Sequence, residues 1–284
     1  MEISDLAVHV LKRVPKNAFS RAFGVVSDVE FPPAAQQVIN RSFASLTGVD
    51  VAEAEAEPEA YETLNAYFTR RLRDGVRDVE VDQQEAVVSP VDGTVGICGT
   101  IEEGTMFQAK GRSYRLLDLV DSAREAAAFD GGCYATLYLA PRDYHRIHTP
   151  VGGRVDRVSY IPGHLFPVNP FGVANIDELF AVNERLITYL ETPKLGRIGV
   201  VKVGATCVGR ISLSFEPFET NGNFRRRREF HPTDDIELDH GQELAVFNLG
   251  STVILLVEHP DFEFGDDITQ GRACRVGQCL GGIG

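Results

Sequence analysis

A glycine followed by a serine, Gly250-Ser251, stands between two apolar segments near the C-terminal end of the chain. The downstream segment, 253–257, is continuously apolar, which is typical of a strand buried on both faces. Because glycine has no Cβ, its backbone can adopt a strained conformation that exposes the Gly250 carbonyl carbon. The hydroxyl of Ser251 is then able to attack that carbonyl and exchange the amide bond for an ester. The alternative is a simple turn or bulge between two strands.

The ester breaks if a base removes the Cα proton of Ser251, and the chain is then cut between residues 250 and 251. The new terminus hydrolyses to a pyruvoyl group, which is a ketone built into the protein. An isolated Gly-Ser pair is far more often a turn. The chemical interpretation therefore depends on a base and an acidic partner elsewhere in the chain.

Two histidines, His145 and His148, lie in a polar segment directly after an expected strand at 133–140. A loop at the end of a strand holds side chains in place and leaves them accessible. A helical turn would bring both rings to one side, because they are three residues apart. Histidine is the usual proton carrier near neutral pH, and no third ligand of suitable spacing indicates a metal site. A surface loop with two incidental histidines is the alternative.

A possible acidic partner is Asp92, which stands at a turn between two expected strands in the run Ser-Pro-Val-Asp-Gly-Thr, residues 89–94. An aspartate in such a turn commonly caps its own backbone. The other interpretation is that Asp92 accepts the ring N–H of a histidine, as the aspartate of a Ser-His-Asp triad does.

The elements that must position these residues fall into two regions. Amphipathic helices are expected at 3–14, from 31 to Gly48 and from Leu64 to near Gly75. From residue 86 onward, short apolar runs alternate with glycine-rich turns, which is typical of a sandwich or barrel. The sequence therefore predicts an α+β fold, in which an N-terminal helical region, 1–80, precedes a β-rich, sandwich-like or barrel-like domain, 81–284. Short amphipathic helices usually dock on their own core, and lying in a membrane interface is the less common alternative.

The β-rich region contains nine expected strands and two expected helices. The helices are at 121–129 and, more weakly, 174–182. The strands are at 86–91, 94–98, 105–109, 133–140, 154–161, 197–204, 206–213, 243–249 and 252–257.

Composition narrows the class of protein. A net charge of −13 argues against nucleic-acid binding, which needs clustered positive charge. No apolar run reaches the roughly 18 residues that span a bilayer, and the N-terminus lacks a signal-peptide pattern, so we expect a cytoplasmic protein. The five cysteines are an odd number and contain no C-x-x-C pair, which favours reduced thiols. Two basic clusters, Arg70 to Arg77 and Arg225 to Arg228, are either solvated surface or contacts for anionic lipid headgroups.

Together these segments resemble the phosphatidylserine decarboxylase proenzymes of bacterial type. The resemblance runs nearly from end to end of the chain. It is carried by the Leu-Gly-Ser-Thr run at 249–252, the Tyr-His-Arg-Ile-His run at 144–148, the Asp92-Gly93 turn, and the segments 16–21, 68–77 and 160–169.

The resemblance implies self-cleavage between Gly250 and Ser251. The products are a large chain, 1–250, and a small chain, 251–284, which carries a pyruvoyl group derived from Ser251 as the cofactor. The enzyme would be a pyruvoyl-dependent carboxy-lyase that converts phosphatidylserine to phosphatidylethanolamine and CO2. The substrate amine forms a Schiff base with the pyruvoyl carbon, which accepts electrons as CO2 leaves.

The resemblance also implies roles for individual residues. Asp92, His148 and Ser251 would form the endoproteolytic triad, and His145 would contact substrate or supply a proton during decarboxylation. Phe166 and Asn169 are substrate-pocket candidates, although side chains in such a loop often pack on the core instead.

The resemblance further implies a homodimer whose N-terminal helices rest on the cytoplasmic face of the cell membrane as a peripheral protein. Two other interpretations remain. One is a hydrolase that uses Ser251 as a standing nucleophile, although the G-x-S-x-G elbow is absent. The other is a membrane-associated binding module without enzymatic activity.

Overall fold

A large antiparallel sheet forms the centre of the protein in the computed structural model. The structure describes residues 16–81, 83–109, 111–206, 210–220, 226–248 and 251–284. The strand order of the sheet is β11-β7-β8-β9-β14-β5-β2-β16, and β12 also pairs with β7. Its strands are β2 (Gly93–Thr100), β5 (Cys133–Tyr138), β7 (Gly153–Ile161), β8 (Arg185–Thr192), β9 (Gly196–Val203), β11 (Arg228–Phe230), β12 (Glu237–Leu238), β14 (Thr252–Val257) and β16 (Ala273–Cys274).

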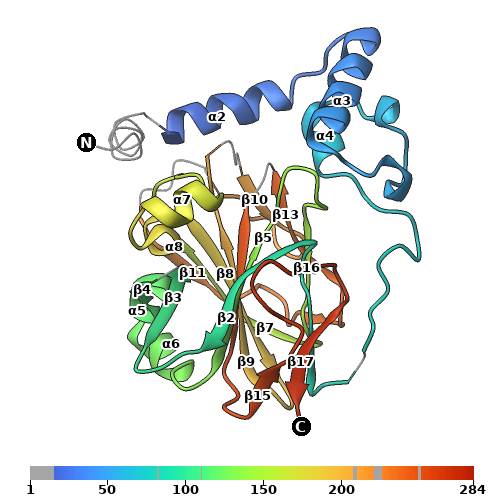
Figure 1. The fold of residues 1–284 in the computed structure, drawn as a ribbon. Coiled ribbons are helices and arrows are strands. Elements are labelled where there is room, and N and C mark those ends of the chain that lie inside the picture. The colour runs from blue at the N-terminus through green and yellow to red at the C-terminus, as the bar shows by residue number, and fades with distance from the viewer. Residues whose placement is uncertain (1–15, 82, 110, 207–209, 221–225, 249–250) are drawn as a thin grey trace.

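Three smaller β units complete the body (Figure 1). One sheet has the order β10-β13-β6, a second has the order β1-β17-β15, and β3 pairs with β4. These strands are β1 (Ala86–Val88), β3 (Thr105–Ala109), β4 (Arg112–Arg115), β6 (Arg146–His148), β10 (Arg210–Leu213), β13 (Glu243–Asn248), β15 (Phe262–Phe264) and β17 (Cys279–Ile283).

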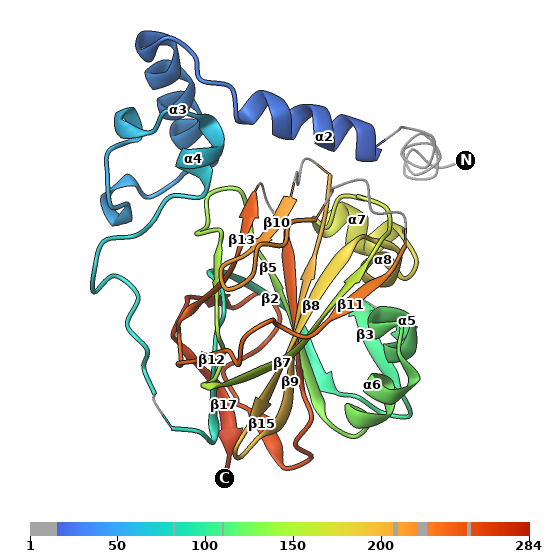
Figure 2. The same ribbon diagram turned by 180° about the vertical axis from the view of Figure 1, so that it is seen from behind.

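Helices lie at the N-terminus and along one side of the body, and Figure 2 shows the same arrangement from behind. The N-terminal elements are α2 (Lys16–Ser27), α3 (Pro33–Thr47), η1 (Val51–Glu53), η2 (Pro58–Ala60) and α4 (Leu64–Phe68). The others are α5 (Leu116–Val120), α6 (Ala123–Ala128), α7 (Pro170–Asn175) and α8 (Leu179–Val182). Helix α3 starts at a proline and ends at Gly48, whose φ of 80° is the left-handed conformation that glycine adopts readily.

Strand β14 is the central element, because it pairs with β5 on one side and β9 on the other. Val253, Leu255 and Val257 pack into the core on one face of the sheet. Ile254 and Leu256 pack into a second core on the other face. The expectation of a strand buried on both faces is confirmed, and it places Ser251 at the start of the most enclosed strand of the fold.

The expected fold class is confirmed in its coarser form, since the described chain is mixed α/β with more strand than helix. Several details differ. Strand β8 was not expected, α4 is shorter than the helix expected from Leu64, and the expected helix 174–182 is divided between α7 and α8. Helix α2 was also not expected, and the expected helix 3–14 lies outside the described residues.

One side chain in the core of the sheet is a lysine. Lys202 in β9 is fully buried, and its Nζ donates to Thr188 Oγ1 at 2.7 Å and to the Val200 carbonyl at 3.2 Å. No carboxylate pairs with Lys202 among the described residues. Burial lowers the pKa of Lys202 well below its usual value, because the charged form loses its hydration.

This burial predicts that Lys202→Met stabilises the protein at neutral pH. Burial in the folded state disfavours the protonated form of Lys202, whereas the unfolded chain binds a proton up to a pH near 10.5. Stability of the natural chain should therefore rise with pH by about 1.4 kcal/mol per unit between the lowered folded pKa and the unfolded pKa. Urea unfolding at several pH values should show this slope in the natural chain and its loss in Lys202→Met. Lys194→Met, at an exposed site, is the control, and an unchanged slope in Lys202→Met contradicts the prediction.

Candidate active site

Ser251 lies at the junction between β13 and β14, and it is enclosed. Its side chain is 1% exposed, and its carbonyl accepts a hydrogen bond from the Leu139 amide at 3.0 Å. The Ser251 hydroxyl has no hydrogen-bond partner among the described residues, and neither has that of Thr252. A buried polar group without a partner is unusual in a folded protein and indicates either strain or a chemical role. Leu249 and Gly250 lie outside the described residues.

A tight turn leads from β5 toward the two histidines. The Asp143 carboxylate accepts a hydrogen bond from the Ala140 amide at 2.7 Å, and the Asp143 amide donates to the Ala140 carbonyl at 2.9 Å. Since Leu139 is bonded to Ser251, this turn begins beside the candidate nucleophile. The turn therefore fixes the position of His145 relative to Ser251.

His145 is fully buried at the end of this turn. Its ring lies 4.0 Å, between centroids, from the ring of Phe68 in α4, and its Nδ1 is 2.8 Å from the Asp143 carbonyl. Burial lowers the pKa of His145 to about 3, so the imidazole is neutral at pH 7. Because Nδ1 faces a carbonyl, Nδ1 carries the proton, and Nε2 is an acceptor that has no partner among the described residues.

His148 has different surroundings from His145. Its Nδ1 lies 2.6 Å from the Gly241 carbonyl, and its Nε2 lies 3.1 Å from the Tyr144 hydroxyl. Burial lowers the pKa of His148 and raises that of Tyr144 to about 12, so Tyr144 is the donor in their bond. Nε2, the nitrogen that a general base would use, is therefore occupied by Tyr144.

Strand pairing separates the two histidines. Residues 146–148 form strand β6, not the helical turn expected from their spacing. Along β13, His148 lies opposite Glu243, whereas the His145 carbonyl accepts from the Phe247 amide. The five steps from Glu243 to Asn248 span roughly 16 Å of strand. His145 thus lies near the Ser251 end of β13, and His148 lies at the other end.

Asp92 is bound by an arginine. Nε of Arg77 donates to both carboxylate oxygens of Asp92, at 2.9 and 3.1 Å, and an Nη of Arg77 reaches Asp92 at 2.5 Å. The Val276 amide donates to Asp92 at 2.9 Å. Asp92 also lies close to His148. The His148 amide donates to the carbonyl of Pro90, two residues before Asp92. The negative charge of Asp92 acts to raise the pKa of His148, although burial has the larger, opposite effect. Among the described residues, no hydrogen bond joins Asp92, His148 and Ser251.

The two substrate-pocket candidates have structural contacts. The Asn169 side chain caps α7 by accepting from the Gly172 amide at 3.0 Å. Phe166 is 6% exposed, packs in the second core, and has Lys16 Nζ 4.2 Å from its ring centroid. A cavity lies next to this segment. Val168 and Pro170, on each side of Asn169, line it, but the side chains of Phe166 and Asn169 do not.

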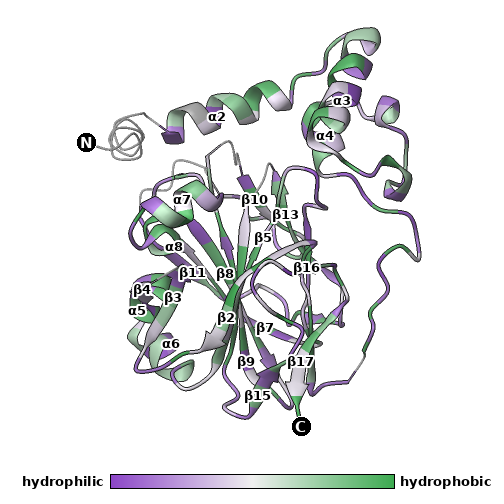
Figure 3. Cartoon of the chain, in the orientation of Figure 1, coloured by the Kyte–Doolittle hydropathy of each residue, from purple (hydrophilic) through white to green (hydrophobic). Residues whose placement is uncertain are grey.

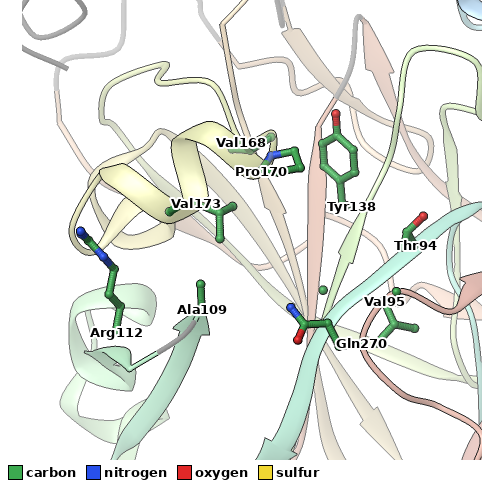
Figure 4. A pocket seen from close by; sticks show the side chains of 12 residues that line it. Thr94, Val95, Ala109, Arg112, Tyr138, Val168, Pro170, Val173 and Gln270 are labelled. Atoms are coloured by element: carbon green, nitrogen blue, oxygen red, sulfur yellow. The ribbon is translucent and has the colours of Figure 1, made fainter. Parts of the chain in front are cut away.

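That cavity, of about 580 Å³, adjoins the start of β14 (Figure 4). Tyr138, which lines it, lies opposite Thr252 in the sheet. Its walls come from β2, β3, β5 and α7, and they are mainly apolar, including Val95, Ala109, Val168, Pro170 and Val173.

The N-terminal helices reach the candidate site. Asn65 in α4 donates to the Asn248 side chain at 3.0 Å and to Asp28, after α2, at 2.9 Å. The first basic cluster belongs to the same region, but Arg70 is buried, Arg77 is half-buried, and only Arg71 and Arg73 are exposed. The interpretation of that cluster as solvated surface is therefore wrong for Arg70. The spacing of these arginines in the sequence does not indicate which of them turn inward, because the groups that they contact lie far away in the sequence.

Comparison with known proteins shows the family of the chain. A family model described as phosphatidylserine decarboxylase matches residues 64–282. The phosphatidylserine decarboxylase proenzyme of Anaeromyxobacter sp. (strain K) is 44% identical over 280 residues, which cover 98% of each chain. That of Myxococcus xanthus (strain DK1622) is 41% identical over 278 residues, covering 96% of this chain and 97% of the relative. The chain therefore belongs to the phosphatidylserine decarboxylase family.

Proposed function

We propose that this protein removes the carboxylate of phosphatidylserine to give phosphatidylethanolamine and CO2, after cutting its own chain between Gly250 and Ser251. Family membership supports the reaction. The observation that carries the self-cleavage is the buried hydroxyl of Ser251, which has no partner among the described residues and follows directly after a glycine. Such a hydroxyl keeps its lone pairs available for attack.

The cut is proposed to begin when Ser251 Oγ attacks the Gly250 carbonyl and the peptide nitrogen leaves, which gives an ester. Removal of the Ser251 Cα proton then expels the Gly250 carboxylate. The resulting enamine takes up water and releases ammonia, leaving a pyruvoyl group at residue 251. The products are chain 1–250 and chain 251–284.

His148 and Asp92 are proposed as the base and its partner in this cut. Their proximity supports the pairing, and the Nδ1–Gly241 bond supports the tautomer that leaves Nε2 as the acceptor. For the relay to act on Ser251, His148 Nδ1 must exchange the Gly241 carbonyl for Asp92, Nε2 must leave the Tyr144 hydroxyl, and β6 must shift along β13. Self-cleavage is thus proposed to start from a conformation that differs from the one described here.

His145 is proposed to move protons during decarboxylation. The pyruvoyl group supplies an acceptor for the electrons left when CO2 departs. The substrate loses its ammonium proton to solvent before it reacts, and the negative charge of its carboxylate beside His145 raises the pKa of the ring, so that Nε2 can take up a proton. The protonated ring then returns a proton to the substrate Cα after CO2 has left. The lowered pKa of His145 favours this return, because an enclosed imidazolium readily gives up its proton.

Intact-mass measurement of the purified protein, together with CO2 release from phosphatidylserine vesicles, tests the proposal. A small chain of residues 251–284, about 4 kDa in proportion to the 31.2 kDa of the whole chain, should carry the pyruvoyl mass. A single uncut chain that still releases CO2 contradicts the proposal. An uncut chain with esterase activity identifies a hydrolase, and lipid binding without CO2 release identifies a binding module.

A membrane surface is the proposed location of the reaction. No helix in the described ranges is long and apolar enough to cross a bilayer. The N-terminal helices nevertheless carry exposed apolar side chains, namely Val25 and Val26 on α2 and Val38 and Leu46 on α3. Figure 3 shows hydrophobic segments, in green, on both α2 and α3. Exposed apolar residues on helices suit insertion at a membrane interface. Placement on the cytoplasmic face of the cell membrane, and the homodimer implied by the resemblance, stay predictions.

The double substitution Val25→Ser and Val26→Ser should weaken binding to phosphatidylserine vesicles by roughly 10-fold, because each valine loses buried apolar area. Co-sedimentation with the vesicles measures this. Leu117→Ser, which alters a partly exposed side chain on α5, is the control and should bind as the natural protein does. Equal binding by all three proteins argues against docking through α2.

A further inference from the structure

Two cavities of opposite character share a lining residue on β2, two strands away from the start of β14. The apolar cavity and a polar cavity of about 260 Å³ are both lined by Thr94. Thr94 lies opposite Tyr138, and Tyr138 lies opposite Thr252, the residue after Ser251. Figure 4 shows Thr94 and Tyr138 together at one side of the apolar cavity. A ligand with an apolar part and a polar part could therefore occupy both cavities with its reactive end near Ser251.

The polar cavity contains an arginine that lacks an acidic partner. Arg70 is 4% exposed, and its Nη2 donates to the backbone carbonyls of Arg142 and Asp143, at 2.8 and 3.3 Å. Its Nε has no partner, and no carboxylate lies within ion-pair distance of it among the described residues. By contrast, Arg77 in the same cavity pairs with Asp92 and with Glu53 at 2.6 Å.

Arg70 is costly to bury, because it has lost its hydration and makes no direct ion pair, although the charges of Asp92 and Asp143 act on it from a longer distance to raise its pKa. Burial lowers the pKa of Arg70 for this reason, although a guanidinium stays charged at neutral pH. Nε of Arg70 has no acceptor among the described residues. Nη1 has only a long contact, of 3.5 Å, with the Phe68 carbonyl. An anion in the cavity would satisfy both the charge and these donors.

Arg70 is also close to the proposed proton carrier. It is bonded to the turn that ends at His145, and Phe68, two residues earlier, stacks on the His145 ring. The charge of Arg70 is near enough to add to the effect of burial in lowering the pKa of His145. An anion bound by Arg70 would thus lie beside the reacting part of the substrate.

We infer that Arg70 binds the phosphodiester of the phosphatidylserine headgroup in the polar cavity, while the apolar cavity receives the glycerol backbone and the start of an acyl chain. This rests on the proposed function. The phosphodiester is favoured over the substrate carboxylate because it keeps its charge throughout the reaction. A strong pair with the carboxylate would stabilise the very group that must leave. The fork of the guanidinium suits two phosphate oxygens.

Binding to the processed enzyme tests this inference. The ligands are sn-glycero-3-phosphoethanolamine, ethanolamine and serine, with affinities measured by calorimetry. Arg70→Gln removes the charge and places an amide group near the position of Nε. It should weaken binding of the phosphate-bearing ligand roughly 10- to 100-fold and leave that of ethanolamine unchanged. Arg70→Lys should recover part of the loss, and Arg73→Met, at an exposed arginine, should match the natural enzyme.

Unchanged binding of the phosphate-bearing ligand in Arg70→Gln overturns the inference. So does a loss confined to serine, which would assign Arg70 to the carboxylate. If Arg70→Gln is not processed, Arg70→Lys decides, because losing the fork should still weaken the phosphate-bearing ligand more than ethanolamine. Intact mass and CO2 release by the natural protein are measured in parallel. Failure there rejects the proposed function itself, whereas normal activity with unchanged binding rejects only the role of Arg70.

Discussion

Ser251→Ala should leave the protein as one uncut chain without decarboxylase activity. Alanine keeps the Cβ and the position of β14, so the fold should persist, but it has no oxygen to attack the Gly250 carbonyl. Without the cut there is no pyruvoyl group, and both functions are lost together. Intact-mass measurement and a CO2-release assay on the same sample check this prediction.

The control for this variant is Ser214→Ala, which removes a hydroxyl that donates to Glu243 at the exposed surface. That protein should be cut and active. The appearance of the 251–284 fragment from Ser251→Ala would show that another group breaks the chain. CO2 release from an uncut Ser251→Ala protein would separate the lyase activity from the pyruvoyl group and reject the proposed function.

The fold was largely predictable because its strands are marked by local patterns. The run Val253 to Val257 is apolar at every position, and the strand it forms is buried on both faces. Strand β8 was predictable on the same grounds, since Leu186, Ile187, Tyr189 and Leu190 form an apolar run, and the sequence analysis overlooked it. The helix expected from Leu64 to near Gly75 ends at Phe68, and Arg70, two residues later, turns inward to reach the 142–143 carbonyls.

The site was predictable only in its residue types. Sequence spacing brought His145 and His148 together, but the pairing of β6 with β13 places them at opposite ends of a strand. Asp92 was expected either to cap its own turn or to orient a histidine. Its carboxylate binds Arg77, and a local sequence pattern does not locate that side chain. Contacts such as Arg70 with Arg142 or Asn65 with Asn248 join segments 72 and 183 residues apart. Such contacts form only when tertiary packing brings distant segments together, so local sequence patterns do not predict them.

His145→Ala should be cut normally but should turn over phosphatidylserine about 10²–10⁴-fold more slowly. His145 is the neutral imidazole nearest the Ser251 end of β13, and positioned proton transfer typically contributes that factor. The prediction is checked by comparing the rate of appearance of the small chain with the rate of CO2 release per pyruvoyl group. Both rates come from one preparation, so a folding defect would lower them together.

His148→Ala is the matched variant, and the contrast between the two decides the assignment. It should slow or stop the cut, because His148 is the proposed base, and Tyr144→Phe should leave the cut intact by freeing His148 Nε2. The opposite result, with normal processing of His148→Ala and an uncut His145→Ala, would make His145 the base for both reactions. The register of β6 on β13 would then explain the cut without any rearrangement, since His145 already faces Phe247, four residues before Ser251.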